Sequence, residues 1–355
     1  MMIPTSQKWE GKSQFSDLQS LANHVILITG AAGSIGSEMV RQIAQFNPKH
    51  LILIDAAETP MHDIRLFMHS HYPEIQCDTI VSSITNGTHM EAIFEKNRPD
   101  YVFHAAAYKH VPMMEDNPSE AVQNNIYGTR IIADLAVKYG TKKFVMISTV
   151  KAVNPTNVMG CSKRICEIYC QSLNKAIVEG KVKGVTQFVT TRLANVLGSN
   201  GSVISIFREQ IKNGGPVTVT HLDIIRSFML IPEACKLVLE AGTMGIGGEI
   251  FIFDIGEPVR IADLANRMIK LSGAKDIEVK FTGLRNGEKL FEEVPNDAET
   301  TKPTDHKRIM EVSVRGYEYG EVSENVKRLY EVSMNYDDLE TVRVMKEIVP
   351  EFKNR

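Results

Sequence analysis

The chain has 355 residues, of which 43% are hydrophobic, enough to bury one large core or two lobes that share a cleft. A formal net charge of -3 and the lack of an arginine-rich stripe argue against a nucleic-acid partner. No apolar run approaches the roughly 20 residues that span a bilayer, and the first 22 residues do not have the pattern of a signal peptide. These features predict a cytoplasmic protein with no membrane span.

The cysteines number five, with no paired CxxC spacing: Cys77, Cys161, Cys166, Cys170 and Cys235. An odd number without such spacing supports neither a disulfide framework nor a zinc site, so we expect reduced thiols. Cys166 and Cys170 lie four residues apart and can share a helix face, a spacing that suits small buried thiols better than a metal pair. We therefore expect no metal.

The predicted elements begin after a polar, weakly patterned arm, residues 1–22, in which Trp9 and Phe15 are possible anchors. Short apolar stretches then alternate with helix-length segments, the first helix starting at about Ile35. This alternation is typical of an α/β fold with a doubly wound parallel sheet that helices cover on both faces. The predicted strands are residues 25–28, 51–54, 79–81, 101–104, 144–147 and 187–190.

The pattern changes after residue 191 to glycine-rich turns, short strands and further helices. It predicts a smaller substrate-binding lobe over the carboxyl edge of the sheet, where ligands bind in such folds. From about Glu318 the chain is charged and helical in pattern. We expect an N-terminal arm at 1–22, a nucleotide-binding domain at 23–191 with part of 225–255, a substrate lobe at 192–224 and 256–340, and a C-terminal tail at 341–355.

A glycine-rich turn lies between the first predicted strand and helix, at residues 29–36 (TGAAGSIG), with the spacing GxxGxxG. Glycine lets the backbone approach a pyrophosphate at the amino end of the helix. Asp55 ends the second strand, where a carboxylate can bind ribose hydroxyls and repel a 2′-phosphate. This favours NAD over NADP, and the alternative is that Asp55 caps a helix beginning near Glu58.

This turn, together with residues 104–107 (HAAA) and 125–129 (NIYGT), resembles the extended short-chain dehydrogenase/reductase family. Within that family, longer segments resemble the UDP-N-acetylglucosamine 4,6-dehydratases of bacterial polysaccharide biosynthesis. The resemblance runs from about residue 23 to about residue 315 and implies a Rossmann-type fold, NAD and a UDP-sugar substrate. The segments are 107–112 (AYKHVP), 151–157 (KAVNPTN) and 283–290 (GLRNGEKL).

The resemblance also implies a set of cofactor-binding residues. Ser83 departs from the family pattern, which has an aspartate there that meets adenine. Lys109 is expected on the nicotinamide side of the cleft, and His104 is expected to be structural or to lie at the cofactor's edge. The set is Gly30, Gly33, Ser34, Ile35, Gly36, Asp55, Ser83, Ile84, Ala105, Ala106, Lys109, Asn125 and Lys163.

Members of this branch oxidise the sugar at C4, remove the C5 proton, expel the C6 hydroxyl as water and return the hydride to C6. The Tyr-x-x-x-Lys pair of the superfamily corresponds here to Met159 and Lys163, and configuration-retaining members of the branch also have methionine. Thr149 corresponds to the residue that bonds the reacting hydroxyl, and Lys151 to the lysine of a Ser/Thr-Asp-Lys element. Val150 stands where that element has its aspartate.

Val150 cannot exchange a proton, and losing one positioned acid commonly costs about 10²–10⁴-fold in rate. Either Lys151 or a water takes over, or the reaction stops before elimination, or Val150 is an introduced inactivating substitution. Leu222, Ile225 and Ser227 also depart from the family's usual proline, threonine and aromatic residue. These departures indicate altered chemistry or substrate, or neutral drift in a working dehydratase.

The substrate-binding residues that the resemblance implies are Asn195, Arg226, Arg285 and Glu288. Asn195 and the two arginines are expected at the diphosphate, because a guanidinium can bond two phosphate oxygens at once. Glu288 either holds the Arg285 guanidinium, bonds the nucleotide ribose, or is an ordinary charge at a helix start.

Three functions remain open from the sequence. The first is a UDP-N-acetylglucosamine 4,6-dehydratase, the second a C4 epimerase or related oxidoreductase, and the third a catalytically inactive subunit that binds NAD and a UDP-sugar. Helices of this superfamily often form dimer faces, and Cys166, Ile168 and Tyr169 lie on such a segment. We therefore expect a homodimer or a larger homo-oligomer.

Overall fold

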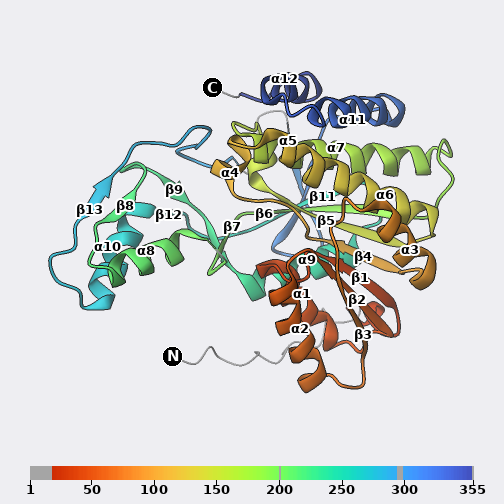
Figure 1. Cartoon of the computed structure of the whole chain (residues 1–355), viewed down its shortest axis with the longest axis horizontal. Helices are drawn as coiled ribbons and strands as arrows, with labels where there is room; N and C mark the ends of the chain where they lie inside the picture. The colour runs from red at the N-terminus through yellow and green to blue at the C-terminus, as the bar shows by residue number, and fades with distance from the viewer. Residues whose placement is uncertain (1–17, 200, 294–298, 354–355) are drawn as a thin grey trace.

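The computed structural model describes residues 18–199, 201–293 and 299–353, so Trp9 and Phe15 lie outside the described residues. Its centre is a nine-stranded sheet with helices on both faces (Figure 1). The strands are β1 (Val25–Thr29), β2 (His50–Asp55), β3 (Gln76–Val81), β4 (Tyr101–His104), β5 (Lys143–Thr149), β6 (Gln187–Leu193), β11 (Ile250–Phe253), β14 (Thr300–Pro303) and β15 (Ile309–Ser313).

The strand order is β14-β15-β11-β6-β5-β4-β1-β2-β3. Strands from β3 through β11 pair in parallel, whereas β15 and β14 are antiparallel additions at the far edge. The order 3-2-1-4-5-6 within this sheet is that of the Rossmann fold. The expected fold class is thereby confirmed, and each of the six predicted strands falls within one of β1 to β6. Continuous apolar runs predict these strands, because helices cover both faces of the sheet and both faces must therefore be apolar.

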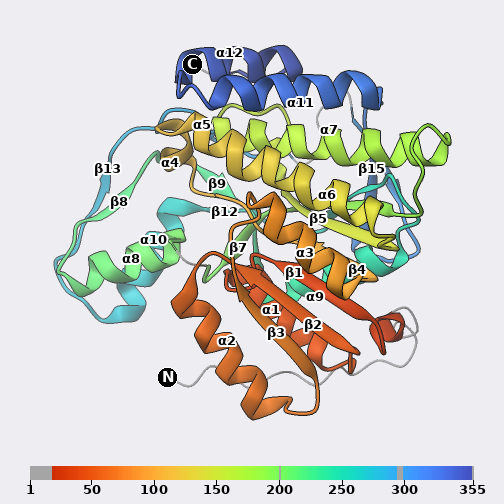
Figure 2. The same ribbon diagram turned by 45° about the vertical axis from the view of Figure 1, so that its right-hand side comes forward.

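Two helical layers cover the two faces of the sheet (Figure 2). Each layer packs on its own cluster of buried hydrophobic side chains. One face of the sheet carries α1 (Ser34–Ala44), α2 (Glu58–His71) and α9 (Ile231–Met244). The other carries α3 (Gly87–Asn97), α6 (Gly128–Lys138) and α7 (Val158–Val178). Short helical segments complete the chain: η1 (Leu18–Leu21), α4 (Val111–Glu115), α5 (Pro118–Glu120), η2 (Ala121–Tyr127) and η3 (Val150–Ala152).

An outer layer made by α11 (Tyr319–Ser333) and α12 (Asp338–Ile348) covers α7 (Figure 2). Val326 and Met345 of these helices are fully buried in the same cluster as the α7 side chains. Together with β14 and β15, this places residues 300–352 with the large sheet, and neither in the substrate lobe nor in a separate tail. Apolar side chains at helical spacing drive the docking, although the segment is charged on average.

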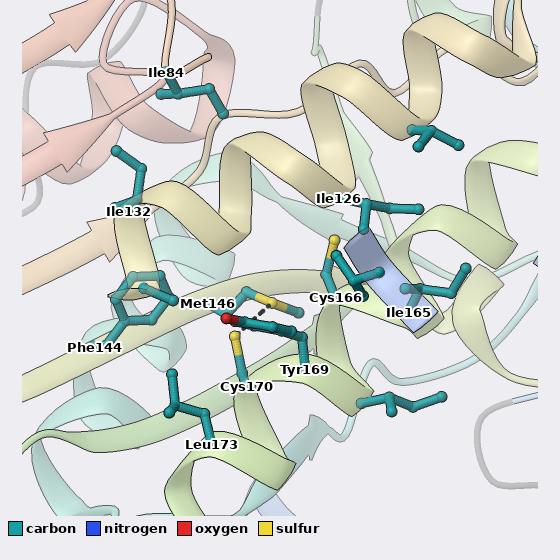
Figure 3. Close-up of a cluster of buried hydrophobic side chains, with 14 of the residues drawn as sticks. Ile84, Ile126, Ile132, Phe144, Met146, Ile165, Cys166, Tyr169, Cys170 and Leu173 are labelled. Atoms are coloured by element: carbon teal, nitrogen blue, oxygen red, sulfur yellow. Dashed lines mark hydrogen bonds between the residues drawn. The ribbon is translucent and has the colours of Figure 1, made fainter. Parts of the chain in front are cut away.

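The covered surface of α7 corrects one expectation. Cys166 is fully buried and Tyr169 is 1% exposed, inside the chain's own core (Figure 3). Ile168 is fully buried in the same cluster. The expectation that these three residues form a dimer face is therefore wrong, because α6, α11 and the rest of this core already cover them. A homo-oligomer would have to use another surface.

The smaller lobe lies beside the carboxyl ends of the parallel strands (Figure 1). Phe207, Val217 and Ile261 are among the buried residues of its own small core. The lobe and its connections contain β7 (Asn195–Leu197), α8 (Val203–Lys212), β8 (Val217–Val219), β9 (Ile225–Arg226), β10 (Phe228–Leu230), β12 (Val259–Arg260), α10 (Ile261–Ser272) and β13 (Val279–Phe281).

Within the described residues, every helix is too short or too polar to cross a membrane. All five cysteines are free thiols, and Cys77 alone among them is only partly buried.

Candidate active site

A cavity of about 950 Å³ lies where the carboxyl edge of the sheet meets the smaller lobe. Its walls come from the glycine-rich turn, the loops after β4 and β5, the start of α7 and the segment 283–293. These pieces are far apart in the sequence, and the parallel sheet brings them together because its strands all end at the same edge.

The glycine-rich turn forms one end of this cavity, with Gly30, Gly33 and Gly36 among its lining residues. A Cβ atom at Gly30, where φ is +66°, would come within 2.7 Å of the Ala106 amide nitrogen. The helix α1 starts directly after Gly33, which supplies no capping side chain. The positive end of the helix dipole therefore lies at the cavity, an arrangement that suits an anionic pyrophosphate.

Asp55 is fixed beside this turn at the end of β2. Its carboxylate accepts hydrogen bonds from the amides of Ala32 (3.0 Å) and Ala57 (2.9 Å). Both carboxylate oxygens keep further acceptor capacity, which fits the two hydroxyls of a ribose. Ala57 is the N-cap residue of α2 and no side chain caps this helix, so Asp55 holds the residue before α2 without capping it.

The expected cofactor residues divide into two groups. Asn125 is buried and exchanges two hydrogen bonds with the main chain of Tyr108 (2.8 and 3.0 Å), which fixes the loop that carries Lys109. Gly30, Gly33, Ser34, Ile35, Gly36, Ala105, Lys109 and Lys163 line the cavity. Asp55, Ser83, Ile84, Ala106 and Asn125 lie outside its wall.

The expected catalytic residues all reach the cavity. Thr149 ends β5, and its hydroxyl accepts a hydrogen bond from the Lys151 amide (3.3 Å). Lys163 lies one helical turn after Met159, and its ammonium donates to the Ile147 carbonyl (3.0 Å). Burial lowers the pKa of Lys163. Val150 is 2% exposed and adds only an alkyl group to the wall.

His104 is structural. Its ring nitrogens bond the hydroxyls of Thr29 (2.7 Å) and Thr129 (2.9 Å), so both nitrogens are engaged. Burial and the charge of Lys163 lower its pKa to about 3. The imidazole is therefore neutral and ties the end of β4 to β1 and α6.

Lys151 belongs to a ring of three polar side chains that the sequence did not reveal. Its Nζ lies 2.7 Å from Glu292 Oε1 and donates to Asn195 Oδ1 at 3.0 Å. Asn195 Nδ2 in turn donates to Glu292 Oε2 at 2.8 Å. Asn195, expected at the diphosphate, thus holds the two charged residues in place. The available signal for Glu292 was its position two residues after the end of the matched segment 283–290.

The segment 283–293 is anchored to the start of α7. The Gly287 carbonyl accepts hydrogen bonds from Thr156 Oγ1 (2.7 Å) and Asn157 Nδ2 (3.2 Å). Asn157 also caps α7 by accepting from the Gly160 amide (2.8 Å). Gly287 has φ +71°, and a Cβ there would lie 2.7 Å from the Thr156 carbonyl oxygen. Only glycine fits this crossing.

The expected substrate residues all line the same cavity. Arg226 donates to the carbonyls of Ile225 (2.8 Å), Lys289 (2.7 Å) and Leu290 (3.1 Å), so it holds the segment 283–293. Arg285 is exposed at the cavity wall.

Glu288 closes its own turn. Its carboxylate accepts from the Arg285 amide (3.1 Å) and from Thr220 Oγ1 (3.1 Å). It holds the Arg285 main chain in place, and no helix starts at this position in the described segment.

The Rossmann-type fold and the matches to known proteins place the chain among the extended short-chain dehydrogenase/reductases. Residues 26–314 match the family of polysaccharide biosynthesis proteins, and the chain belongs to this family.

Two relatives in polysaccharide biosynthesis are similar to this chain. The chain is 47% identical over 302 residues to the capsular polysaccharide biosynthesis protein CapD of Staphylococcus aureus, covering 84% of this chain and 49% of CapD. It is 47% identical over 290 residues to the probable polysaccharide biosynthesis protein EpsC of Bacillus subtilis, covering 80% of this chain and 47% of EpsC. The chain therefore spans about half the length of these relatives.

A solved structure shares this fold. Pen from Bacillus thuringiensis superposes with a TM-score of 0.74 at 27% identity, covering 87% of this chain and 98% of Pen.

Proposed function

We propose that this protein is an NAD-dependent UDP-N-acetylhexosamine 4,6-dehydratase that acts on UDP-N-acetylglucosamine. One observation carries the proposal: a single cavity joins the glycine-rich turn to Thr149, Lys151 and Lys163 and continues to Arg285. The glycine-rich turn suits the pyrophosphate of a dinucleotide, and Arg285 suits the diphosphate of a UDP-sugar. Residues suited to both ligands therefore line the same cavity as the catalytic residues.

NAD fits the described residues. The glycine-rich turn and the amino end of α1 would hold the pyrophosphate, and Asp55 would bind the adenosine ribose and repel a 2′-phosphate. Bound NAD supplies the hydride acceptor for sugar C4 and the hydride donor for C6. Lys163 would hold the nicotinamide ribose from its position in α7.

Oxidation at C4 requires a group that positions the C4 hydroxyl. Thr149, at the end of β5, can hydrogen-bond the C4 hydroxyl, and the Lys163 charge favours loss of that hydroxyl's proton to a solvent water as the hydride leaves C4. Met159 supplies a nonpolar wall beside them and no proton. This arrangement needs no tyrosine, because Thr149 orients the sugar.

Water elimination requires an acid near C6, and this requirement separates a dehydratase from a C4 epimerase. Lys151 follows Val150 directly and lines the cavity with an ammonium group. An epimerase needs proton transfer only at C4, where Thr149 lies in this proposal. Lys151, two residues further along the chain, provides a second charged group, which favours the dehydratase. Lys151 replaces the missing aspartate as the nearest proton donor of this motif.

The proposal is tested by the mass and proton NMR spectra of UDP-N-acetylglucosamine after incubation with the protein and NAD. A product lighter by one water supports it. An isomer of unchanged mass would identify an epimerase, and binding of both ligands without turnover would identify a binding subunit. A parallel Val150→Asp variant is expected to eliminate water faster, because it restores a positioned acid.

A further inference from the structure

The ion pair between Lys151 and Glu292 joins the catalytic motif to a distant part of the chain. Glu292 comes from the segment 283–293, and only 9% of its side chain is exposed, against 26% for Lys151. Both residues line the cavity together with Val150. A charged pair so sheltered, whose remaining hydrogen bonds run to Asn195, is held in one geometry.

Glu292 is ionised in this setting. Burial opposes ionisation, but the charges of Lys151 and Arg226 outweigh it and hold the pKa of this carboxyl below its usual range. Arg226 Nε lies 3.6 Å from Glu292 Oε1, on the same oxygen that faces Lys151. Glu292 can therefore accept a proton, and Lys151 can donate one.

We propose that Glu292 and Lys151 form the proton-transfer pair for water elimination, in place of the aspartate that is missing at Val150. This inference rests on the proposed dehydratase function. Glu292 is the base and Lys151 is the acid. Neither residue needs the side chain at position 150 to exchange a proton.

The elimination step balances with these two groups alone. The Glu292 carboxylate takes the C5 proton, the C5–H electrons form the C5=C6 double bond, and the C6–O bond breaks. Lys151 gives its proton to the departing hydroxyl, so one water leaves. Glu292 then carries a proton and Lys151 is a neutral amine. The proton moves across their 2.7 Å contact and restores the pair.

Two neighbouring carboxylates of the same segment serve other partners. Glu288 bonds Thr220 Oγ1 and the Arg285 amide, at 3.1 Å each. Glu293 bonds Asn154 Nδ2 at 2.5 Å and Lys289 Nζ at 3.1 Å. Lys151 pairs with Glu292 and not with Glu293, so Glu293→Gln is a matched control that removes one charge from the adjacent position.

The experiment compares acid-quenched reactions of the wild type, Glu292→Gln, Glu293→Gln and the double variant Val150→Asp/Glu292→Gln by mass spectrometry. Glu292→Gln is expected to lose about 10²–10⁴-fold in water elimination. It should still form enzyme-bound 4-keto sugar, two hydrogens lighter than substrate, because C4 oxidation does not use Glu292. Glu293→Gln, which removes one charge from the same cavity wall, should lose far less of the rate than Glu292→Gln. The double variant should recover much of the loss, because the carboxylate introduced at position 150, next to Lys151, can take the C5 proton in place of Glu292.

Water elimination by Glu292→Gln at the wild-type rate would overturn the inference, as would a double variant no faster than Glu292→Gln. A wild type that releases no water would instead overturn the proposed function. The pair is then tested without turnover, through brief acetylation and peptide mass mapping of Lys151. A protonated amine bonded to a carboxylate resists acylation, so Glu292→Gln should raise acetylation of Lys151 several-fold. Equal labelling would overturn the inference.

Discussion

Arg192 and Glu167 form a doubly hydrogen-bonded ion pair in which both side chains are completely buried. Arg192 Nε and Nη2 each donate to one oxygen of Glu167 at 2.8 Å. Glu167 Oε1 also accepts from Ser148 Oγ at 2.7 Å, next to Thr149. The pair therefore links α7 and β6 to the strand end that carries the catalytic residues.

Replacing Arg192 with methionine should lower the free energy of unfolding by about 3–5 kcal/mol, because it leaves buried Glu167 without its main partner. Urea unfolding followed by circular dichroism measures this change. Arg328→Ala is the control, since Arg328 and Glu347 form an exposed pair, with side chains 49% and 41% exposed. Its loss should cost less than about 1 kcal/mol. Equal costs for the two variants would contradict this account of the pair.

Glu167 also predicts how stability depends on pH. Burial alone would raise its pKa, but Arg192, Arg164 and Ser148 together lower it. A carboxyl whose pKa is lower in the folded protein than in the unfolded chain stabilises the fold. This stabilisation is fully present at a pH above the pKa of the unfolded chain, about 4.3. The stabilisation is lost as the pH falls through the pKa that Glu167 has in the folded protein. Glu167→Gln should therefore flatten the acid side of the stability profile, and an unchanged acid slope would show that Glu167 is not responsible.

Gly287→Ala should weaken substrate binding more than it slows turnover. A Cβ there would lie 2.7 Å from the Thr156 carbonyl oxygen, at a backbone φ of +71°. The segment 283–293 must then shift, and Arg285 shifts with it. We expect KM for the UDP-sugar to rise at least about tenfold, consistent with a loss of roughly 1.4 kcal/mol in binding. Gly320→Ala, with open space around it, should leave KM unchanged.

Lys163→Met should separate stability from activity. Burial lowers the pKa of Lys163, which means that the fold bears the cost of an enclosed ammonium. Methionine removes that cost at similar volume, so the unfolding free energy should stay equal or rise, while turnover falls at least about 10²-fold. Lys183→Met, at an exposed position, should change neither. A variant that unfolds at lower urea would show that Lys163 has a structural role instead.

The sequence predicted what is local. The strands β1 to β6 are continuous apolar runs, and Thr149, Met159 and Lys163 follow one another across a single strand and helix. Their shared cavity was predictable, because parallel strands end at one edge. Glu292 was not, because its place beside Lys151 depends on how a long segment crosses the start of α7.

The sequence also did not predict which side chains from distant elements would bond to one another. We expected Arg226 to bind the diphosphate of the substrate. In the structure its guanidinium donates hydrogen bonds to three main-chain carbonyls. The helical pattern after Glu318 predicted α11 and α12, but periodicity does not say which surface a helix covers. The dimer-face expectation for Tyr169 failed for this reason.

The central claim is tested most directly with UDP-N-acetylglucosamine that carries deuterium at C4. The proposed dehydratase oxidises C4 and reduces C6 on the same molecule, so NMR of the product should show deuterium in a new C6 methyl group. The product should also lack one water. Deuterium that stays at C4 in a sugar of unchanged mass would contradict the account.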